Sequence, residues 1–374
     1  RSESDVIKEM VPDESGYRHA VKVWYENSWI RSVLTDLGAA GYKIVLTSDH
    51  GSIMVNRSSM VAADKHSSSG VRHKHGRNIN ANDKSALDIR NLESYKLPSL
   101  GHITYDEMFK GYTEFCLALI DGGVDVFLLE TCQDPLQIKA ALHASQEASR
   151  QREVEIPIMV SVTIELSGTM LIGTDAGTIA TILEPFDILS LGFNCGTGPE
   201  QVIKHVRTLS EVWGKPISVH ANAGLPQNRG GYTYYPMGPD EFVAQQEKFL
   251  NYDGVSFLGG CCGTTPQHIR ALVNAVHAIT PKSPSGSQPN SIASLFGTTT
   301  LMQEPAPLLM GERSNATGSK AFKELLLAEN YEGTLSVAQQ QVRAGAHAID
   351  VNVGFAGREE TKDMTEVIGM YNQK

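Results

Sequence analysis

The sequence lacks any hydrophobic run long enough to cross a lipid bilayer. A transmembrane helix needs about 20 consecutive apolar residues, and the longest apolar runs of this 374-residue chain are far shorter. The first residues, Arg1-Ser2-Glu3-Ser4-Asp5, also lack the apolar segment of a signal peptide. We therefore expect a cytoplasmic protein with no membrane partner, and we expect no nucleic-acid partner.

Cysteine is scarce as well. The chain has only five cysteines, and two of them are adjacent, so that a disulfide between those two would be strained. This usage fits a reducing compartment better than a disulfide framework. A length of 374 residues allows two or three domains.

Charge and glycine are distributed unevenly along the chain. Residues 1–100 contain 14 Lys and Arg, 12 Asp and Glu, no Cys and 6 Gly, whereas residues 101–374 have a net charge of −12, all 5 Cys and 28 Gly. A Pro-, Ser- and Gly-rich stretch from Thr280 to Pro289 is typical of a linker. We therefore predict four segments: 1–100, 101–282, a linker at 283–299, and 300–374.

Short apolar runs recur about every 30 residues in the second segment. They lie at 126–129, 158–162, 188–191, 217–219 and 255–258, and amphipathic stretches such as 135–142 and 199–206 separate them. Strands alternating with helices at this period are typical of βα units on a parallel sheet. Polar residues follow each run, as they do at the active-site face of a βα barrel. We predict an α/β fold with about five βα units of a (βα)8 TIM-type barrel.

Three cysteines follow two of these predicted strands. Cys195 comes just after the run at 188–191, and Cys261 and Cys262 follow the run at 255–258. Glycines on both sides of the adjacent pair let the backbone turn tightly enough to bring its thiols to one ion. Three protein ligands leave one position of a zinc ion open, as in catalytic sites. An inert or redox-active pair is the alternative, and Cys116 and Cys132 are expected to be buried side chains without such a role.

Three motifs of this region are distinctive. They are 192–195 (Gly-Phe-Asn-Cys), 221–226 (Ala-Asn-Ala-Gly-Leu-Pro) and 259–269 (Gly-Gly-Cys-Cys-Gly-Thr-Thr-Pro-Gln-His-Ile). With them, the chain from about residue 103 to residue 281 resembles the homocysteine-binding module of the cobalamin-dependent methionine synthase family.

That resemblance implies a site and a reaction. It implies that Cys195, Cys261 and Cys262 bind Zn²⁺, which holds homocysteine as a thiolate that takes a methyl group from methylcobalamin. Glu130 matches the strand-end carboxylate that recognises the substrate's amino group, and Asn222 is a further candidate for the same pocket. His220 is either a polar wall of the pocket or a histidine with an ordinary structural role.

The last segment carries a second resemblance. An apolar run at 307–310 leads into Gly311-Glu312-Arg313-Ser314-Asn315, a helix is predicted at 320–326, and Ala348-Ile349-Asp350-Val351-Asn352 follows. This pattern resembles the start of the pterin-binding barrel of the same family, which implies methyltetrahydrofolate as the methyl donor. Asp350 and Asn352 alternate along a strand, so both can face a pterin. Asn315 is a third candidate, with helix capping as the alternative for Asn315 and Ser319.

Residues 1–100 show a different pattern. The run 42–51 ends in Asp49-His50-Gly51, and six Lys or Arg and three His lie between Arg57 and Lys84. This stretch resembles the C-terminal part of a PglZ-type, alkaline-phosphatase-like domain, whose basic side chains would suit phosphate groups. A solvated basic loop is the alternative. The pattern gives a second functional hypothesis, a metal-dependent phosphoesterase or regulatory module centred on Asp49 and His50.

Both barrels are incomplete in the sequence pattern. Five of eight βα units are recognisable in the first barrel, and two strands in the second. We find no cobalamin-binding segment, so a separate cobalamin-binding module is an expected partner. A third hypothesis is therefore an inactive fusion of partial domains, because an opened barrel exposes two sheet edges.

Overall fold

The computed structural model describes residues 61–63, 79–81, 97–229 and 232–372. Strands β1 (Val61–Ala63) and β2 (Ile79–Ala81) form a two-stranded antiparallel sheet. Asp49, His50 and the predicted strand before them lie outside the described residues, as does most of the basic stretch. The hypothesis built on them stays a prediction.

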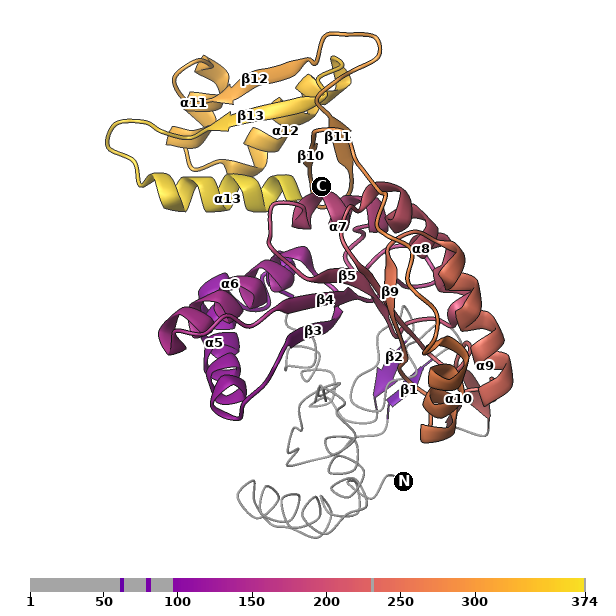
Figure 1. The fold of residues 1–374 in the computed structure, drawn as a ribbon. Helices are drawn as coiled ribbons and strands as arrows, with labels where there is room; N and C mark the ends of the chain where they lie inside the picture. Colours follow the sequence, from indigo (N-terminus) through magenta and orange to yellow (C-terminus); the bar gives the residue numbers. More distant parts are fainter. Residues whose placement is uncertain (1–60, 64–78, 82–96, 230–231, 373–374) are drawn as a thin grey trace.

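A curved parallel sheet of five strands forms the centre of the first unit (Figure 1). Its strands, in spatial order, are β3 (Phe127–Cys132), β4 (Ile158–Val162), β5 (Ser190–Asn194), β6 (Ile217–Ala221) and β9 (Val255–Gly260). The spatial order follows the chain order without a reversal. A doubly wound sheet would reverse at its switch point, so the arrangement is that of a partial TIM-type barrel, as predicted.

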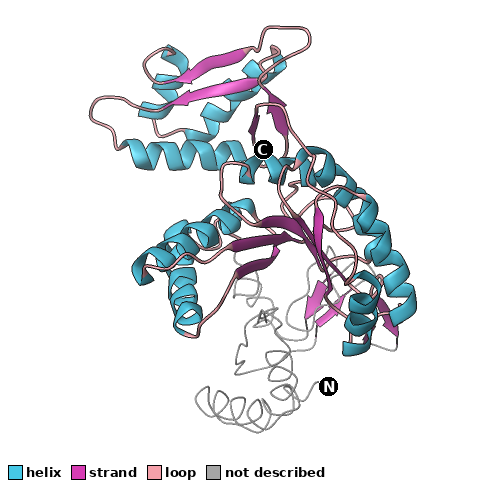
Figure 2. Cartoon of the chain, viewed as in Figure 1, coloured by secondary structure: helices cyan, strands magenta, loops and turns pink. Residues whose placement is uncertain are grey.

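Helices connect the strands and cover one face of the sheet (Figure 2). They are α5 (Tyr105–Asp121), α6 (Pro135–Arg152), α7 (Ala176–Leu183), α8 (Pro199–Val212), α9 (Pro239–Gln246) and α10 (Pro266–Val276). Two 3-10 turns, η2 (Pro98–Leu100) and η3 (Glu247–Asn251), precede α5 and follow α9. The local sequence sets the helix starts: Thr104 and Glu107 form a capping box at α5, and Asp134 caps α6.

Side-chain alternation gives the sheet two different faces. Leu191 and Phe193 of β5 are fully buried in the core beneath the helices, together with Val160, Val219 and their neighbours. Gly192 and Asn194 alternate with these two residues along β5 and therefore face the opposite side of the sheet. The helix-covered face therefore supplies the packing, and the opposite face carries the polar residues of the site.

The two outer strands of this sheet are β3 and β9. Within the described ranges, β3 and β9 each have one neighbouring strand. The helices next to these edges expose apolar side chains: Phe115 of α5, and Ile269 and Val273 one turn apart on α10. None of the described helices is both long and apolar enough to cross a membrane.

The segment predicted as a linker is held along the first unit. The backbone N–H of Ser287 donates to the carbonyl of Glu211 (3.1 Å), and the Thr174 hydroxyl donates to the carbonyl of Leu295 (2.6 Å). A short antiparallel hairpin follows, β10 (Ser291–Ala293) and β11 (Thr298–Thr300), and it contacts α7. Composition alone did not predict these contacts.

The second unit contains two parallel strands and three helices. They are β12 (Met310–Asn315), α11 (Lys320–Leu327), α12 (Tyr331–Arg343), β13 (Ala348–Asn352) and α13 (Glu360–Asn372). Its small core centres on Phe322, Leu326, Val353 and Val367, all fully buried. The two predicted strands and the helix between them are therefore present.

An ion pair at the start of α13 is hydrogen-bonded to Tyr331, the first residue of α12. Arg358 donates two hydrogen bonds to the Asp363 carboxylate, with Nε 2.7 Å from Oδ2, and the Tyr331 hydroxyl donates to Oδ1 at 2.8 Å. The hydrogen bond from Arg358 lowers the pKa of Asp363 below its ordinary value, and the bond from Tyr331 acts in the same direction.

We expect Asp363→Asn to reduce the free energy of unfolding at pH 7 by about 1–3 kcal/mol, because Arg358 loses its nearest charged partner and keeps only the more distant Glu329, at 3.6 Å. A carboxyl with a lowered folded pKa contributes stability above its unfolded pKa and loses it as pH falls through the folded pKa. The difference in the free energy of unfolding between Asp363→Asn and the parent, measured by urea titration, should therefore become smaller as the pH is lowered. Glu147→Gln, which removes an exposed pair with Arg150, should change little; an equal loss there would contradict the prediction.

Candidate metal centre

Three cysteines meet at the carboxyl end of the first sheet. The Sγ atoms of Cys195, Cys261 and Cys262 all lie within 4.8 Å of one another, and those of Cys195 and Cys262 are 3.6 Å apart. Tetrahedral zinc with Zn–S bonds of about 2.3 Å places neighbouring sulfurs about 3.8 Å apart. The donor set and its spacing therefore fit one zinc ion held by three thiolates. None of the chain's five cysteines forms a disulfide.

Strand β6 holds both cysteine turns in place. The backbone N–H of Cys195 donates to the carbonyl of His220 (3.3 Å), and that of Cys261 donates to the carbonyl of Ala221 (3.0 Å). Because β6 lies between β5 and β9, its end is a shared anchor for ligands that are 66 residues apart in sequence. The Asn222 side chain continues this role, since its Oδ1 accepts from the backbone N–H of Cys262 at 3.0 Å.

Residues with a left-handed backbone conformation set the direction of the cysteine side chains. Cys195 has φ 58° and Gly196 has φ 62°, so the chain reverses directly after β5. A left-handed conformation is strained for a residue with a side chain, and such residues concentrate at functional sites. Gly263, with φ 79°, ends the adjacent pair, and a Cβ there would lie 2.3 Å from Cβ of Tyr235. Glycine is required at that position on both grounds.

The electrostatics of the thiol cluster favour a cation. A hydrogen bond with Cys261 lowers the pKa of the Cys195 thiol, but the Cys262 thiol and burial outweigh it and raise that pKa to about 11. Hydrogen bonds with Cys195 and Cys262, together with burial, raise the pKa of the Cys261 thiol. Thiols packed this closely cannot all ionise alone. A divalent cation removes the conflict, because thiolate is the form that binds metal.

The two predicted substrate residues lie at the same end of the sheet. Glu130 belongs to β3 and is followed by Thr131, which has a left-handed φ of 57°. Asn222 is buried, and its side-chain oxygen is used by Cys262 as described above. The structure thus gives Asn222 a part in shaping the cysteine turn. Contact of either residue with a substrate stays a prediction.

Two aromatic side chains beside the cysteines complete the surroundings. His220 of β6 packs its ring over Gly259, and burial lowers its pKa. Tyr235 follows a hairpin formed by β7 (Gln227–Arg229) and β8 (Tyr232–Tyr234) and packs on Gly263. Burial, followed by the charge of Cys262, raises the pKa of Tyr235. Sequence reasoning missed Tyr235, because only the fold places it beside residue 263.

The candidate pterin residues also meet at the ends of strands. Asn315 and Asn352 are register partners on β12 and β13, and Asp350 is exposed, two residues before Asn352. The Asn315 Oδ1 accepts from the backbone N–H groups of Thr317 and Gly318, both at 2.9 Å. The Asn315 oxygen is thus used in a turn, while the Ser319 hydroxyl caps α11. Helix capping therefore describes Ser319, Asn315 stabilises the turn before the helix, and pterin binding stays a prediction.

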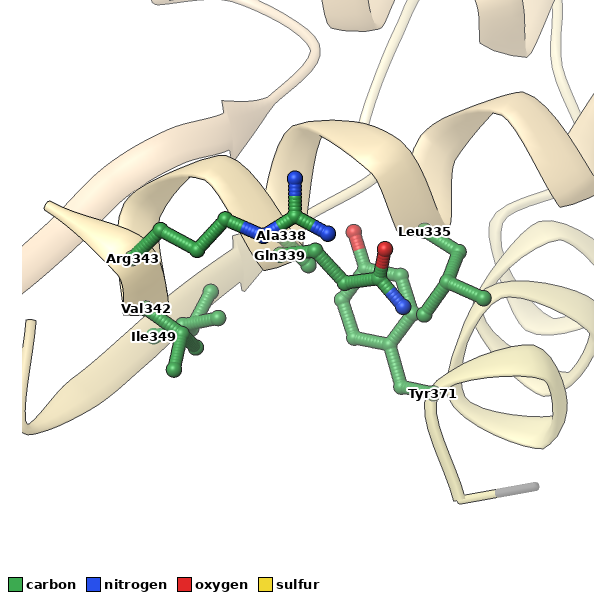
Figure 3. A pocket seen from close by; sticks show the side chains of 7 residues that line it. All are labelled: Leu335, Ala338, Gln339, Val342, Arg343, Ile349 and Tyr371. Atoms are coloured by element: carbon green, nitrogen blue, oxygen red, sulfur yellow. The ribbon is translucent and has the colours of Figure 1, made fainter. Parts of the chain in front are cut away.

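A shallow hollow of about 390 Å³ lies elsewhere on the second unit (Figure 3). Its lining comes mainly from α12, with Ile349 of β13 and Tyr371 of α13. Most of this surface is apolar, and none of the predicted site residues lines it. The hollow is thus separate from both candidate sites.

Two known families match parts of this chain. The family described as homocysteine S-methyltransferase matches residues 13–276. The chain belongs to the homocysteine S-methyltransferase family. A second family, described as pterin binding enzyme, matches residues 311–372. The first match includes residues 13–100, so the predicted boundary at residue 100 stays a prediction.

Relatives of this homocysteine S-methyltransferase family member include longer proteins. Methionine synthase of Mycobacterium leprae is 42% identical over 279 residues, which is 73% of this chain and 23% of that protein. Methionine synthase of Mycobacterium tuberculosis is 42% identical over 269 residues, or 72% of this chain and 23% of that protein. The chain thus spans about a quarter of the length of these relatives.

A solved structure is similar in part. The apo form of the homocysteine methyltransferase MmuM from Escherichia coli is 23% identical with a TM-score of 0.36, covering 46% of this chain and 57% of that one.

Proposed function

We propose that residues 101–282 form a zinc-dependent homocysteine S-methyltransferase segment of the methionine synthase type. The observation that carries this proposal is the meeting of three cysteine sulfurs within 4.8 Å of one another at the carboxyl ends of barrel strands. Three ligands leave one tetrahedral position for a substrate thiolate. Membership of the homocysteine S-methyltransferase family supports homocysteine as the substrate.

Bound zinc would lower the pKa of the homocysteine thiol and hold it as the thiolate that takes a methyl group from methylcobalamin. The protein's own contribution is to fix the direction of the three sulfurs through β6 and the left-handed turn at Cys195. Glu130, at the end of β3, would bind the amino group of homocysteine. Because zinc would hold the sulfur and Glu130 would hold the amino nitrogen, the site would favour a thiol that also carries an amino group over a simple thiol.

The second unit would bind methyltetrahydrofolate as the methyl donor. Asn315, Asp350 and Asn352 would hydrogen-bond the pterin from the ends of β12 and β13, and the family match over residues 311–372 supports this assignment. The cobalamin-binding module would be the partner that carries the methyl group between the two units. The cytoplasm would supply the reduced thiols that the zinc site needs.

Zinc content and methyl transfer together test the function. We expect the purified chain to hold about one zinc ion, measured by atomic absorption, and to convert homocysteine to methionine with free methylcobalamin, measured by chromatography. Removing zinc with a chelator should abolish the conversion, and adding zinc should restore it. Zinc without conversion would favour the inactive fusion, whereas absence of zinc from a folded chain would refute the proposal.

A further inference from the structure

Asn194, the residue before the first cysteine, uses both atoms of its side-chain amide in hydrogen bonds close to the cluster. It lies at the end of β5 and is 2% exposed. Its Oδ1 accepts from the backbone N–H of Thr131 (2.9 Å) and from the hydroxyl of Ser161 (2.8 Å). Its Nδ2 donates to Oγ1 of Thr131 (2.7 Å) and lies 3.9 Å from the sulfur of Cys261. One buried amide therefore connects β3, β4 and the turn after β9.

The orientation of this amide follows from its partners. A backbone N–H can only donate, so the Asn194 atom that faces Thr131 N must be the oxygen. The NH₂ group is thereby directed toward Thr131 Oγ1 and the Cys261 sulfur. A thiolate sulfur accepts such a hydrogen bond, and an amide donor stabilises the charge that the sulfur carries when it binds a metal.

The other end of the amide acts on the strand that carries Glu130. Thr131 has a left-handed φ of 57°, which is uncommon for a β-branched residue. Its backbone N–H and its hydroxyl both bond to Asn194, and these two contacts compensate the strain. Asn194 thus fixes the residue next to Glu130 at the same time as it contacts a cysteine of the cluster.

We propose that Asn194 is a positioning residue that orients the Cys261 sulfur toward the metal and sets the Glu130 strand end at a fixed place relative to it. This inference rests on the proposed zinc-dependent function. Outer-shell partners of this kind typically change metal affinity by about 10- to 100-fold when they are removed. Asn194 would therefore contribute to binding without touching the metal or the substrate.

The test measures metal binding by the full chain. Asn194→Asp keeps the shape and the oxygen that Thr131 N and Ser161 use, but it presents a carboxylate to the Cys261 thiolate. Asn194→Ser removes the amide without adding charge. We expect both variants to bind zinc about 10- to 100-fold more weakly in competition with a chromophoric chelator, and to shift the sulfur-to-metal charge-transfer band when loaded with Co²⁺.

Gln341→Glu is the matched control. It makes the same amide-to-carboxylate change in a buried side chain, whose Oε1 accepts from Arg313 N (2.6 Å) and whose Nε2 donates to Ser314 (3.1 Å), in the second unit. The metal affinity and charge-transfer band of Gln341→Glu should equal those of the parent, because Gln341 lies outside the cysteine cluster. Circular dichroism confirms that each variant is folded, and Asn194→Ser serves alone if Asn194→Asp does not fold.

The outcomes separate the inference from the function. If the parent binds one metal ion and both Asn194 variants match it in affinity and spectrum, the inference is wrong and the zinc-dependent function stands. If Gln341→Glu weakens binding as much as the Asn194 variants do, the effect is general destabilisation and the inference is wrong. If the folded parent binds no metal, the proposed function fails and the inference fails with it.

Discussion

Replacement of Cys261 by alanine is expected to remove the bound zinc from the chain. The Cys261 sulfur lies within 4.8 Å of the sulfurs of Cys195 and Cys262, so all three would bind one ion. A catalytic zinc site needs three protein ligands, and the variant would supply only two thiolates. We expect the metal content to fall from about one ion per chain to a small fraction, and methyl transfer to homocysteine to be lost with it.

Cys116→Ala provides the matched control for this loss. The Cys116 thiol is buried between α5 and α6, where it lies 3.4 Å from the hydroxyl of Ser145. Burial raises its pKa, which keeps it a neutral thiol that does not bind metal. Cys116→Ala should therefore retain zinc while costing some stability. Retention of one zinc ion per chain after all three cluster cysteines are replaced would rule out the site.

The fold of the first unit follows closely from its sequence pattern. Apolar runs separated by amphipathic helices predicted the five parallel strands, and four of the five run starts lie within one residue of a strand start. The exception is β5, which begins at Ser190 although the apolar run begins at Ile188. Leu189 is 40% exposed, so this leucine belongs to the loop that leads into the sheet. An apolar residue alone does not fix a strand boundary.

The cysteine cluster was predictable because of a topological rule. Parallel strands of a barrel end at one face, so polar residues that follow different strands meet there. The rule brings Cys195, Cys261 and Cys262 together even though it contains no distances. The same rule placed Glu130 and Asn222 at that end.

The hydrogen bonds around the cluster could not be predicted in this way. Asn194 bonds to Thr131, 63 residues earlier, and contacts Cys261, 67 residues later. Such partners depend on side-chain directions and on two left-handed residues, which leave no periodic signal in the sequence. The contact of Tyr235 with Gly263 is of the same kind. The sequence pattern indicated which strand ends meet, and the packing determined which side chains support the ligands.

Replacement of Gly192 by alanine is expected to be the most damaging single-methyl change in the first unit. Gly192 lies in the middle of β5, and its register partner on β6 is Ser218. A Cβ at residue 192 would be 1.8 Å from the Ser218 carbonyl oxygen, 2.2 Å from its Oγ and 2.6 Å from its carbonyl carbon. The carbonyl oxygen and carbon belong to the backbone of a buried strand, so a rotamer change of Ser218 would move only its Oγ and cannot relieve the clash.

The strands β5 and β6 must therefore separate to accept the methyl group. Overpacking of this severity reduces the free energy of unfolding by about 3 kcal/mol or more. The loss should extend to the metal centre, because Cys195 follows the last residue of β5 and its backbone N–H donates to the carbonyl of His220 in β6. Urea unfolding and zinc analysis of the same sample would measure both effects.

Gly111→Ala is the control, and its expected change in stability has the opposite sign. Gly111 lies within α5, and a Cβ there would meet no atom within 4 Å. Alanine is the better helix former by about 1 kcal/mol, so this variant should be slightly more stable than the parent and should keep its zinc. If Gly192→Ala instead unfolds at the same urea concentration as the parent, β5 and β6 are not packed as closely as their backbone contact requires, and the placement of Cys195 by β6 would have to be abandoned.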